Sequence, residues 1–227
     1  MKSEQQIQDA ARVIVFFTDS YTQNKQRKEN EQSESLPSLT DIVSNLESLQ
    51  RQILMKMSCK SATQITKLLH SLTTLSRFKV GTHLREEIDQ QSLEVRRWSR
   101  RCLSQIQYNG DEQDQSKLAN QEYGRMMSLS YSTAGGIGDE QDDEIQYGMF
   151  CISYFLGQLH QGRNNYQPSF QPLPLLARIT EEQIEEEGAN EEIEAQIINK
   201  GFDGIIKSYA NYVKAATLNC FIHTRRR

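Results

Sequence analysis

Apolar residues recur every three to four positions along most of this chain, and this helical spacing is the feature that most limits how it can fold. Runs that alternate apolar and polar residues, which would predict strands, are nearly absent. A helix with one apolar face is marginal alone in water, so such helices have to pack on one another. The sequence therefore predicts an all-α protein, with a four-helix-type bundle and a second helical region joined by polar loops.

The spacing is densest in residues 36–109, which predict four helices with short connections and hence a compact bundle. Polar capping residues mark the expected helix starts: Ser38 with Asp41, Ser61 with Gln64, Thr82, and Ser92. The first of these helices is expected to carry its apolar stripe as far as Met57. The pair Asn109-Gly110 predicts the end of the last helix.

The rest of the chain divides into three further segments. Residues 1–35 predict a helix over 4–24 and a polar linker, and this helix could pack on either helical region. Residues 110–143 are typical of a flexible acidic and glycine-rich loop, with room for a short helix over 117–127.

The segment 144–227 is the predicted C-terminal helical region. It begins with an apolar helix over 144–161, and three prolines then predict an extended or turned segment over 163–179. Thr180 with Gln183 forms a third capping pattern. Gly188 and Gly201 are expected to divide the acidic tract before a final helix over 203–223.

Composition excludes several classes of protein. The formal charge is −4, whereas a duplex-binding domain usually has a clear basic excess, so nucleic acid is a weakly supported partner. No stretch approaches the ~20 apolar residues that cross a bilayer, so no membrane partner is expected. The cysteines lie far apart and predict reduced, buried thiols in a soluble cytoplasmic or nuclear protein: Cys59, Cys102, Cys151 and Cys220.

No combination of residues predicts catalysis, a cofactor or a metal site. Gly135, Gly136 and Gly138 lack both the Lys-Ser/Thr of a phosphate loop and the preceding strand of a dinucleotide site. Cys151 and His160 could act as nucleophile and base, but along one helix they would lie roughly 13 Å apart. The four histidines lack ligand-like spacing. We therefore expect a non-enzymatic protein without a cofactor.

A basic cluster around Trp98 is the strongest candidate for a binding site. At helical spacing Arg97 and Arg101 share one face, and Arg96 and Arg100 share the adjacent strip. The cluster could be a solvated basic face with its stems on the core, or a guanidinium-rich site for carboxylates or phosphates. Trp98 itself shares an apolar stripe, which favours the core. The complete set of candidate partner-binding residues is Lys79, Arg85, Arg96, Arg97, Arg100 and Arg101.

A leucine-patterned helix, an aliphatic-glycine step and a last helix with Glu-Val-Arg follow one another in residues 65–107. The residues concerned are Leu68, Leu69, Leu72 and Leu75, then Val80-Gly81 and Leu84, then Ser92, Glu94-Val95-Arg96 and Leu103. This order resembles the N-terminal helical-bundle domain of transcription elongation factor TFIIS, the LW-domain family. The family's closing tryptophan is replaced here by Gln107-Tyr108. The resemblance implies a nuclear docking module for disordered motifs of transcription and chromatin factors.

Two functions are therefore expected from the sequence. The first is a protein-interaction module that binds acidic-aromatic linear motifs at an apolar groove rimmed by Arg97 and Arg101. The alternative is a structural or scaffold subunit of a larger complex, which could include nucleic acid, with helices 144–161 and 203–223 facing neighbouring chains. The expected partners are other proteins in both cases, and the expected location is nuclear, otherwise cytoplasmic.

Overall fold

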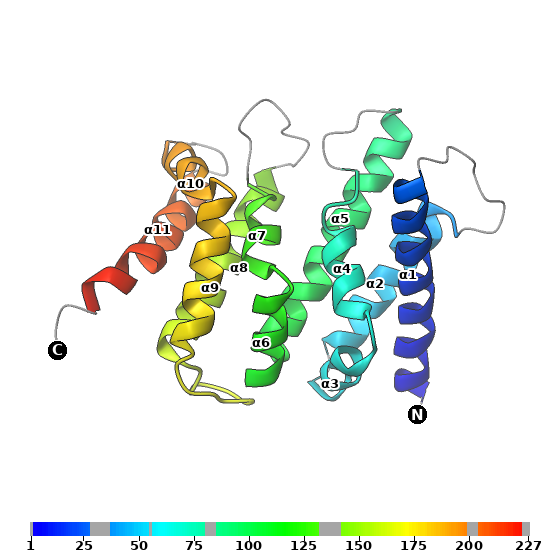
Figure 1. Ribbon diagram of the computed structural model, residues 1–227, viewed down its shortest axis with the longest axis horizontal. Coiled ribbons are helices and arrows are strands. Elements are labelled where there is room, and N and C mark those ends of the chain that lie inside the picture. The colour runs from blue at the N-terminus through cyan, green and yellow to red at the C-terminus, as the bar shows by residue number, and fades with distance from the viewer. Residues whose placement is uncertain are drawn as a thin grey trace. The chain divides into compact units, whose positions relative to one another are not determined.

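Regular structure in the described part of the chain is helical (Figure 1). The computed structural model describes residues 2–27, 37–54, 56–79, 85–131, 142–198 and 204–223. Within these ranges it has eleven helices and no strand, and one isolated bridge joins Arg163 to Phe170. The predicted all-α fold is confirmed. The chain divides into two compact units, unit 1 over residues 1–110 and unit 2 over residues 111–227.

Unit 1 is built around two long helices that run in the same direction. Its helices are α1 (Lys2–Arg27), α2 (Leu39–Ile53), α3 (Lys56–Gln64), α4 (Leu68–Leu75) and α5 (Glu86–Asn109). Three side chains of α5 bond to successive points of α2: Gln91 Nε2 to Thr40 Oγ1 at 3.4 Å, Cys102 Sγ to the Leu46 carbonyl at 3.4 Å, and Asn109 Nδ2 to the Ile53 carbonyl at 3.1 Å. Because these contacts occur in the same order along both helices, α2 and α5 are parallel.

The N-terminal helix α1 belongs to unit 1, where it packs on α2, α3 and α4. Its buried residues follow helical spacing: Ile7, Ala10, Ala11, Ile14 and Phe17. The rings of Phe17 and Tyr21 lie 5.8 and 4.9 Å from the ring of Phe78, which follows α4. These aromatic contacts attach α1 to the end of α4.

Unit 2 is built around α8, which packs on α7, α9 and α11 (Figure 1). Its helices are α6 (Glu112–Asn120), α7 (Tyr123–Ser128), α8 (Asp142–Gln161), α9 (Pro174–Glu186), α10 (Ala189–Ile197) and α11 (Ile205–His223). The apolar stripe predicted for 144–161 is buried, and Phe155 meets Tyr123 of α7 with 4.7 Å between ring centroids. Gly188 separates α9 from α10 with a φ of 68°, as the sequence predicted.

Gly148 allows a close approach between α8 and the turn after α7. A Cβ built on Gly148 would lie 1.7 Å from Ser130 Oγ, which is buried and donates to the Met127 carbonyl at 2.7 Å. The second glycine of α8, Gly157, has no such neighbour within 4 Å. Only the first of the two glycines is therefore explained by packing.

The capping patterns predicted a helix start correctly at one site and wrongly at three. Ser38 and Asp41 form a complete capping box at the start of α2. Ser92 lies inside α5, and its hydroxyl donates to the Ile88 carbonyl at 2.7 Å; Thr180 bonds in the same way inside α9. Ser61 lies inside α3. A serine or threonine can bond to the carbonyl four residues earlier within a helix, so the pattern alone does not fix a helix start.

Other predicted boundaries differ from the structure. The helix expected to reach Met57 ends at Ile53, and α3 begins at Lys56. The segment 110–143 was expected to be mostly loop, but it contains α6 and α7. The proline-containing segment was expected to be extended or turned, but Pro174 is the first residue of α9, a position that favours proline. The polar linker was expected from residue 24, but α1 continues to Arg27. The rest of the linker, Thr82, the glycines at 135–138 and Gly201 lie outside the described residues.

We predict that Gly148→Ala lowers the free energy of unfolding by about 2 kcal/mol, because the added methyl group forces Ser130 out of its packed position. Urea denaturation of the full chain measures this change. Gly157→Ala is the matched control, since it adds the same group to the same helix where nothing lies within 4 Å. Equal stabilities for the two variants would contradict the packing argument.

Candidate protein-binding surface

The basic cluster on α5 is divided between the interior and the surface. Arg96 and Arg100 are only 2% and 1% exposed. Arg96 Nη1 donates to the Phe78 carbonyl at 3.2 Å, and Arg100 Nη2 donates to the Ser76 carbonyl at 3.3 Å. Both carbonyls lie just beyond the last residue of α4, at the negative end of that helix. These two arginines therefore hold α4 against α5 and do not rim a binding surface.

Arg97, Trp98 and Arg101 lie together on the outer strip of α5, and they are the part of the cluster that can meet a partner. The guanidinium of Arg101 lies 5.5 Å from the centroid of the Trp98 ring, which is a cation–π distance. Arg97 Nη1 lies 3.4 Å from Glu94 Oε1. The sequence favoured the core for Trp98, but its side chain is half-buried. The Trp98 ring thus contacts one guanidinium group, that of Arg101, and Arg97 lies one helical turn before Arg101.

The remaining two predicted residues do not join this strip. Lys79 has a φ of 51°, and its ammonium group lies 5.4 Å from the centroid of the Phe78 ring. Arg85 is exposed and occupies the N-cap of α5. The structure therefore brings together Arg97 and Arg101 from the predicted set of six.

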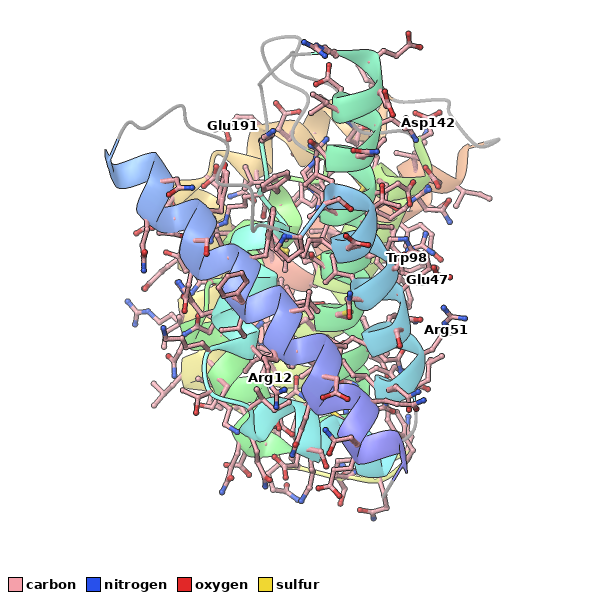
Figure 2. The ribbon with its side chains drawn as sticks, turned by 90° about the vertical axis from the view of Figure 1, so that its right-hand side faces the viewer. Arg12, Glu47, Arg51, Trp98, Asp142 and Glu191 are labelled. Carbon is pink, nitrogen blue, oxygen red and sulfur yellow. The ribbon has the colours of Figure 1, made fainter. Side chains whose placement is uncertain are left out.

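The neighbouring helix α2 contributes two charged residues that the sequence analysis missed. They are Glu47 and Arg51, which Figure 2 labels together with Trp98 on the packed pair of helices α2 and α5. Arg51 Nη2 lies 3.5 Å from Glu47 Oε1, and the Arg51 side chain is 64% exposed. Their spacing of four residues is typical of any solvated helix face, so the sequence held no signal for a site. With these residues the surface has three guanidinium groups and two carboxylates.

The two units carry opposite net charges. Unit 1 has 16 Lys and Arg against 12 Asp and Glu, which gives +4. Unit 2 has 10 Lys and Arg against 18 Asp and Glu, which gives −8. The small net charge of the whole chain hides this difference. An acidic partner is therefore attracted to unit 1 and repelled by unit 2.

Three of the cysteines, and the histidine His160 that was considered with Cys151 for catalysis, have structural surroundings that can be described. Cys59, Cys102 and Cys151 are buried free thiols, and burial raises the pKa of Cys102 well above its usual range. His160 Nε2 lies 2.8 Å from Glu181 Oε1, which links α8 to α9. Among the described residues, no group of three His, Cys, Asp or Glu side chains could hold a metal ion. No helix in the ranges that the structure describes is both long and apolar enough to cross a membrane.

Comparisons with known proteins give no assignment: no family model, curated protein or solved structure matches the chain.

We predict that Arg100→Ala lowers the free energy of unfolding by about 3 kcal/mol, because it leaves the Ser76 carbonyl without its buried charged donor. Arg51→Ala, which removes an exposed guanidinium from the adjacent helix, is expected to change stability by no more than about 0.5 kcal/mol. Urea denaturation of the two variants measures both effects. Similar losses in both would show that Arg100 does not brace the interior.

Proposed function

We propose that this protein is a non-enzymatic interaction module whose unit 1 binds linear motifs containing an aromatic residue and several carboxylates. The observation that carries the proposal is the outer strip of α5, where Arg101 lies over the half-buried ring of Trp98 and Arg97 lies one helical turn before Arg101. Tryptophan and arginine are the residue types that most often dominate binding energy at protein interfaces. The net charge of +4 on the same unit supports an acidic ligand.

In this proposal the two kinds of side chain have different tasks. The aromatic residue of the ligand packs against the Trp98 ring and supplies most of the buried apolar area. The carboxylates of the ligand meet Arg97 and Arg101, which steer association and select against basic sequences. The two neighbouring acids, Glu47 and Glu94, are paired with Arg51 and Arg97 and offset part of this attraction, so the selection depends on the guanidinium groups that are in excess. A disordered ligand loses conformational freedom on binding, so we expect affinities in the micromolar range.

The resemblance to the LW-domain family supports the same kind of ligand and a nuclear setting. Its leucines lie in α4 and its Glu-Val-Arg motif in α5, while Val80-Gly81 and Leu84 lie outside the described residues. One departure is that Glu94-Val95-Arg96, which opens the last helix in that family, lies inside a helix that begins here at Glu86. The motif therefore occupies a longer helix, and Arg96 serves the interior.

The alternative of a scaffold subunit depends on apolar helices that face other chains. The apolar stripe of α8 is buried, and α8 packs on α7, α9 and α11. Among the described side chains of these two helices, the large apolar ones left exposed for such contacts are Phe150 of α8 and Ile205 and Tyr212 of α11. This observation favours the interaction module over the scaffold.

We predict that the double variant Arg97→Glu/Arg101→Glu binds acidic-aromatic peptides at least about tenfold more weakly than the original chain, because it replaces two attractive charges with repulsive ones. Fluorescence polarisation with labelled peptides, each containing one tryptophan or phenylalanine among aspartates, measures the affinity. Binding to the original chain is also expected to weaken as salt is raised.

The matched control is Arg12→Glu/Lys60→Glu, which lowers the charge of unit 1 equally at two exposed positions on α1 and α3. It should weaken binding far less than the α5 variant. The proposal is wrong if no acidic-aromatic peptide binds the original chain, or if the two double variants lose affinity to the same extent while both remain folded.

A further inference from the structure

A second candidate site lies in unit 2, independent of the surface on α5. A pocket of about 430 Å³ lies between the second half of α8 and the loop that follows this helix. Gly157 is among the lining residues, and a Cβ built on it would meet nothing within 4 Å. A glycine inside a helix is unfavourable relative to alanine. Since nothing packs on Gly157, the space above its backbone is open to a ligand.

The loop wall of the pocket is firmly built. Arg163 and Phe170 exchange two backbone hydrogen bonds of 2.8 and 3.0 Å, and the Arg163 Nε donates to the Pro168 carbonyl at 2.6 Å. The guanidinium of Arg163 is covered by two rings, with its centre 4.9 Å from the centroid of Tyr166 and 4.6 Å from that of Phe170. These contacts position Tyr166 at the pocket without the need for a ligand.

A row of aromatic rings leads from this pocket along α8 to α11. The hydroxyls of Tyr166 and Tyr154 are hydrogen-bonded, and Gln158 Nε2 donates to Tyr166 at 2.8 Å. Ring centroids are then separated by 5.8 Å from Tyr154 to Phe150, 5.8 Å from Phe150 to Tyr209, and 6.2 Å from Tyr209 to Tyr212. Phe150 is 40% and Tyr212 64% exposed. A row of five rings, from Tyr166 to Tyr212, suits an elongated ligand.

The hydrogen-bonding groups of the pocket can serve an acceptor-rich ligand. Its lining contains no carboxylate, and its hydroxyl and amide groups, Asn164 and Asn165 among them, can donate as well as accept. A proline-rich segment presents backbone carbonyls but lacks an N–H at each proline, and in the polyproline II conformation those carbonyls are free of internal bonds. Aromatic-lined grooves bind such segments in other proteins.

An anionic ligand fits these groups less well. The only charged residue in the lining, Arg163, is 2% exposed and covered by rings on both sides, and unit 2 has a net charge of −8. The same charge opposes a nucleic-acid strand. We propose that the pocket at Gly157 and the aromatic row from Tyr154 to Tyr212 bind an uncharged, proline-rich peptide segment in the polyproline II conformation.

The test uses the full chain and two pools of uncharged peptides, one with proline at every third position and one with each proline replaced by alanine. Two-dimensional amide NMR should show saturable shifts at Gly157, Asn164 and Asn165 with the first pool and not with the second. Gly157→Ala should raise the thermal midpoint by about 4 °C, because alanine favours helix, and yet weaken binding about tenfold by filling the pocket.

Tyr212→Ala provides a second variant, because its exposed ring can be removed without disturbing the core, and it should weaken binding with no change in the thermal midpoint. Tyr108→Ala, at an exposed tyrosine of unit 1, is the matched control and should bind normally. Equal binding of the two pools, or full affinity in both Gly157→Ala and Tyr212→Ala, would overturn the proposal. Preferential binding of an added acidic peptide pool at this pocket would overturn it in favour of an anion site.

Discussion

Two buried guanidinium groups of α5 determine which arginine side chains of this helix face the interior of unit 1 and which face the solvent. Arg96 and Arg100 donate to the carbonyls of Phe78 and Ser76, which follow α4 and lack partners within that helix. A buried cation costs free energy unless it is hydrogen-bonded, so α4 and α5 have to stay in the arrangement that provides these carbonyls. Since neighbouring residues of a helix point in directions about 100° apart, fixing this pair inward turns Arg97 and Arg101 outward.

This division explains how four arginines around one tryptophan serve two purposes. The inward pair links the short helix α4 to the long helix α5, while in the outward pair Arg101 lies over the ring of Trp98 and Arg97 pairs with Glu94. The charges of the units add to the same distinction, since +4 on unit 1 attracts an acidic ligand and −8 on unit 2 repels it. We infer a protein with two recognition surfaces of unlike chemistry, a cationic one on α5 and an uncharged aromatic one on α8 and α11.

The helices could be predicted from the sequence because their signal is local. The stripe of α8 and the positive φ at Gly188 follow from spacing and residue type within a few positions. Helix starts were less predictable, since the hydroxyls of Ser92 and Thr180 bond inside a helix as readily as that of Ser38 caps one. The segment before α8 contains helices α6 and α7, whose short length gives a weak periodic signal.

The candidate sites depend on contacts between residues far apart in the chain, which spacing cannot reveal. Helical periodicity separated Arg96 and Arg100 from Arg97 and Arg101, but the inward face was chosen by the carbonyls after α4, which no local pattern identifies. The aromatic row is still less visible, because Phe150 meets Tyr209 from another helix. Even the free space at Gly157 is a property of the folded loop around Arg163 and not of the glycine itself.

The central claim, that the arginine cluster is divided between interior and surface, can be tested by arginine-specific labelling. The folded full chain would be treated briefly with phenylglyoxal, and tandem mass spectrometry would locate the modified side chains along α5. Our account predicts that Arg97 and Arg101 react in the folded protein, while Arg96 and Arg100 react only after unfolding in urea. Equal reaction of all four arginines in the folded protein, or faster reaction of Arg96 and Arg100, would contradict it.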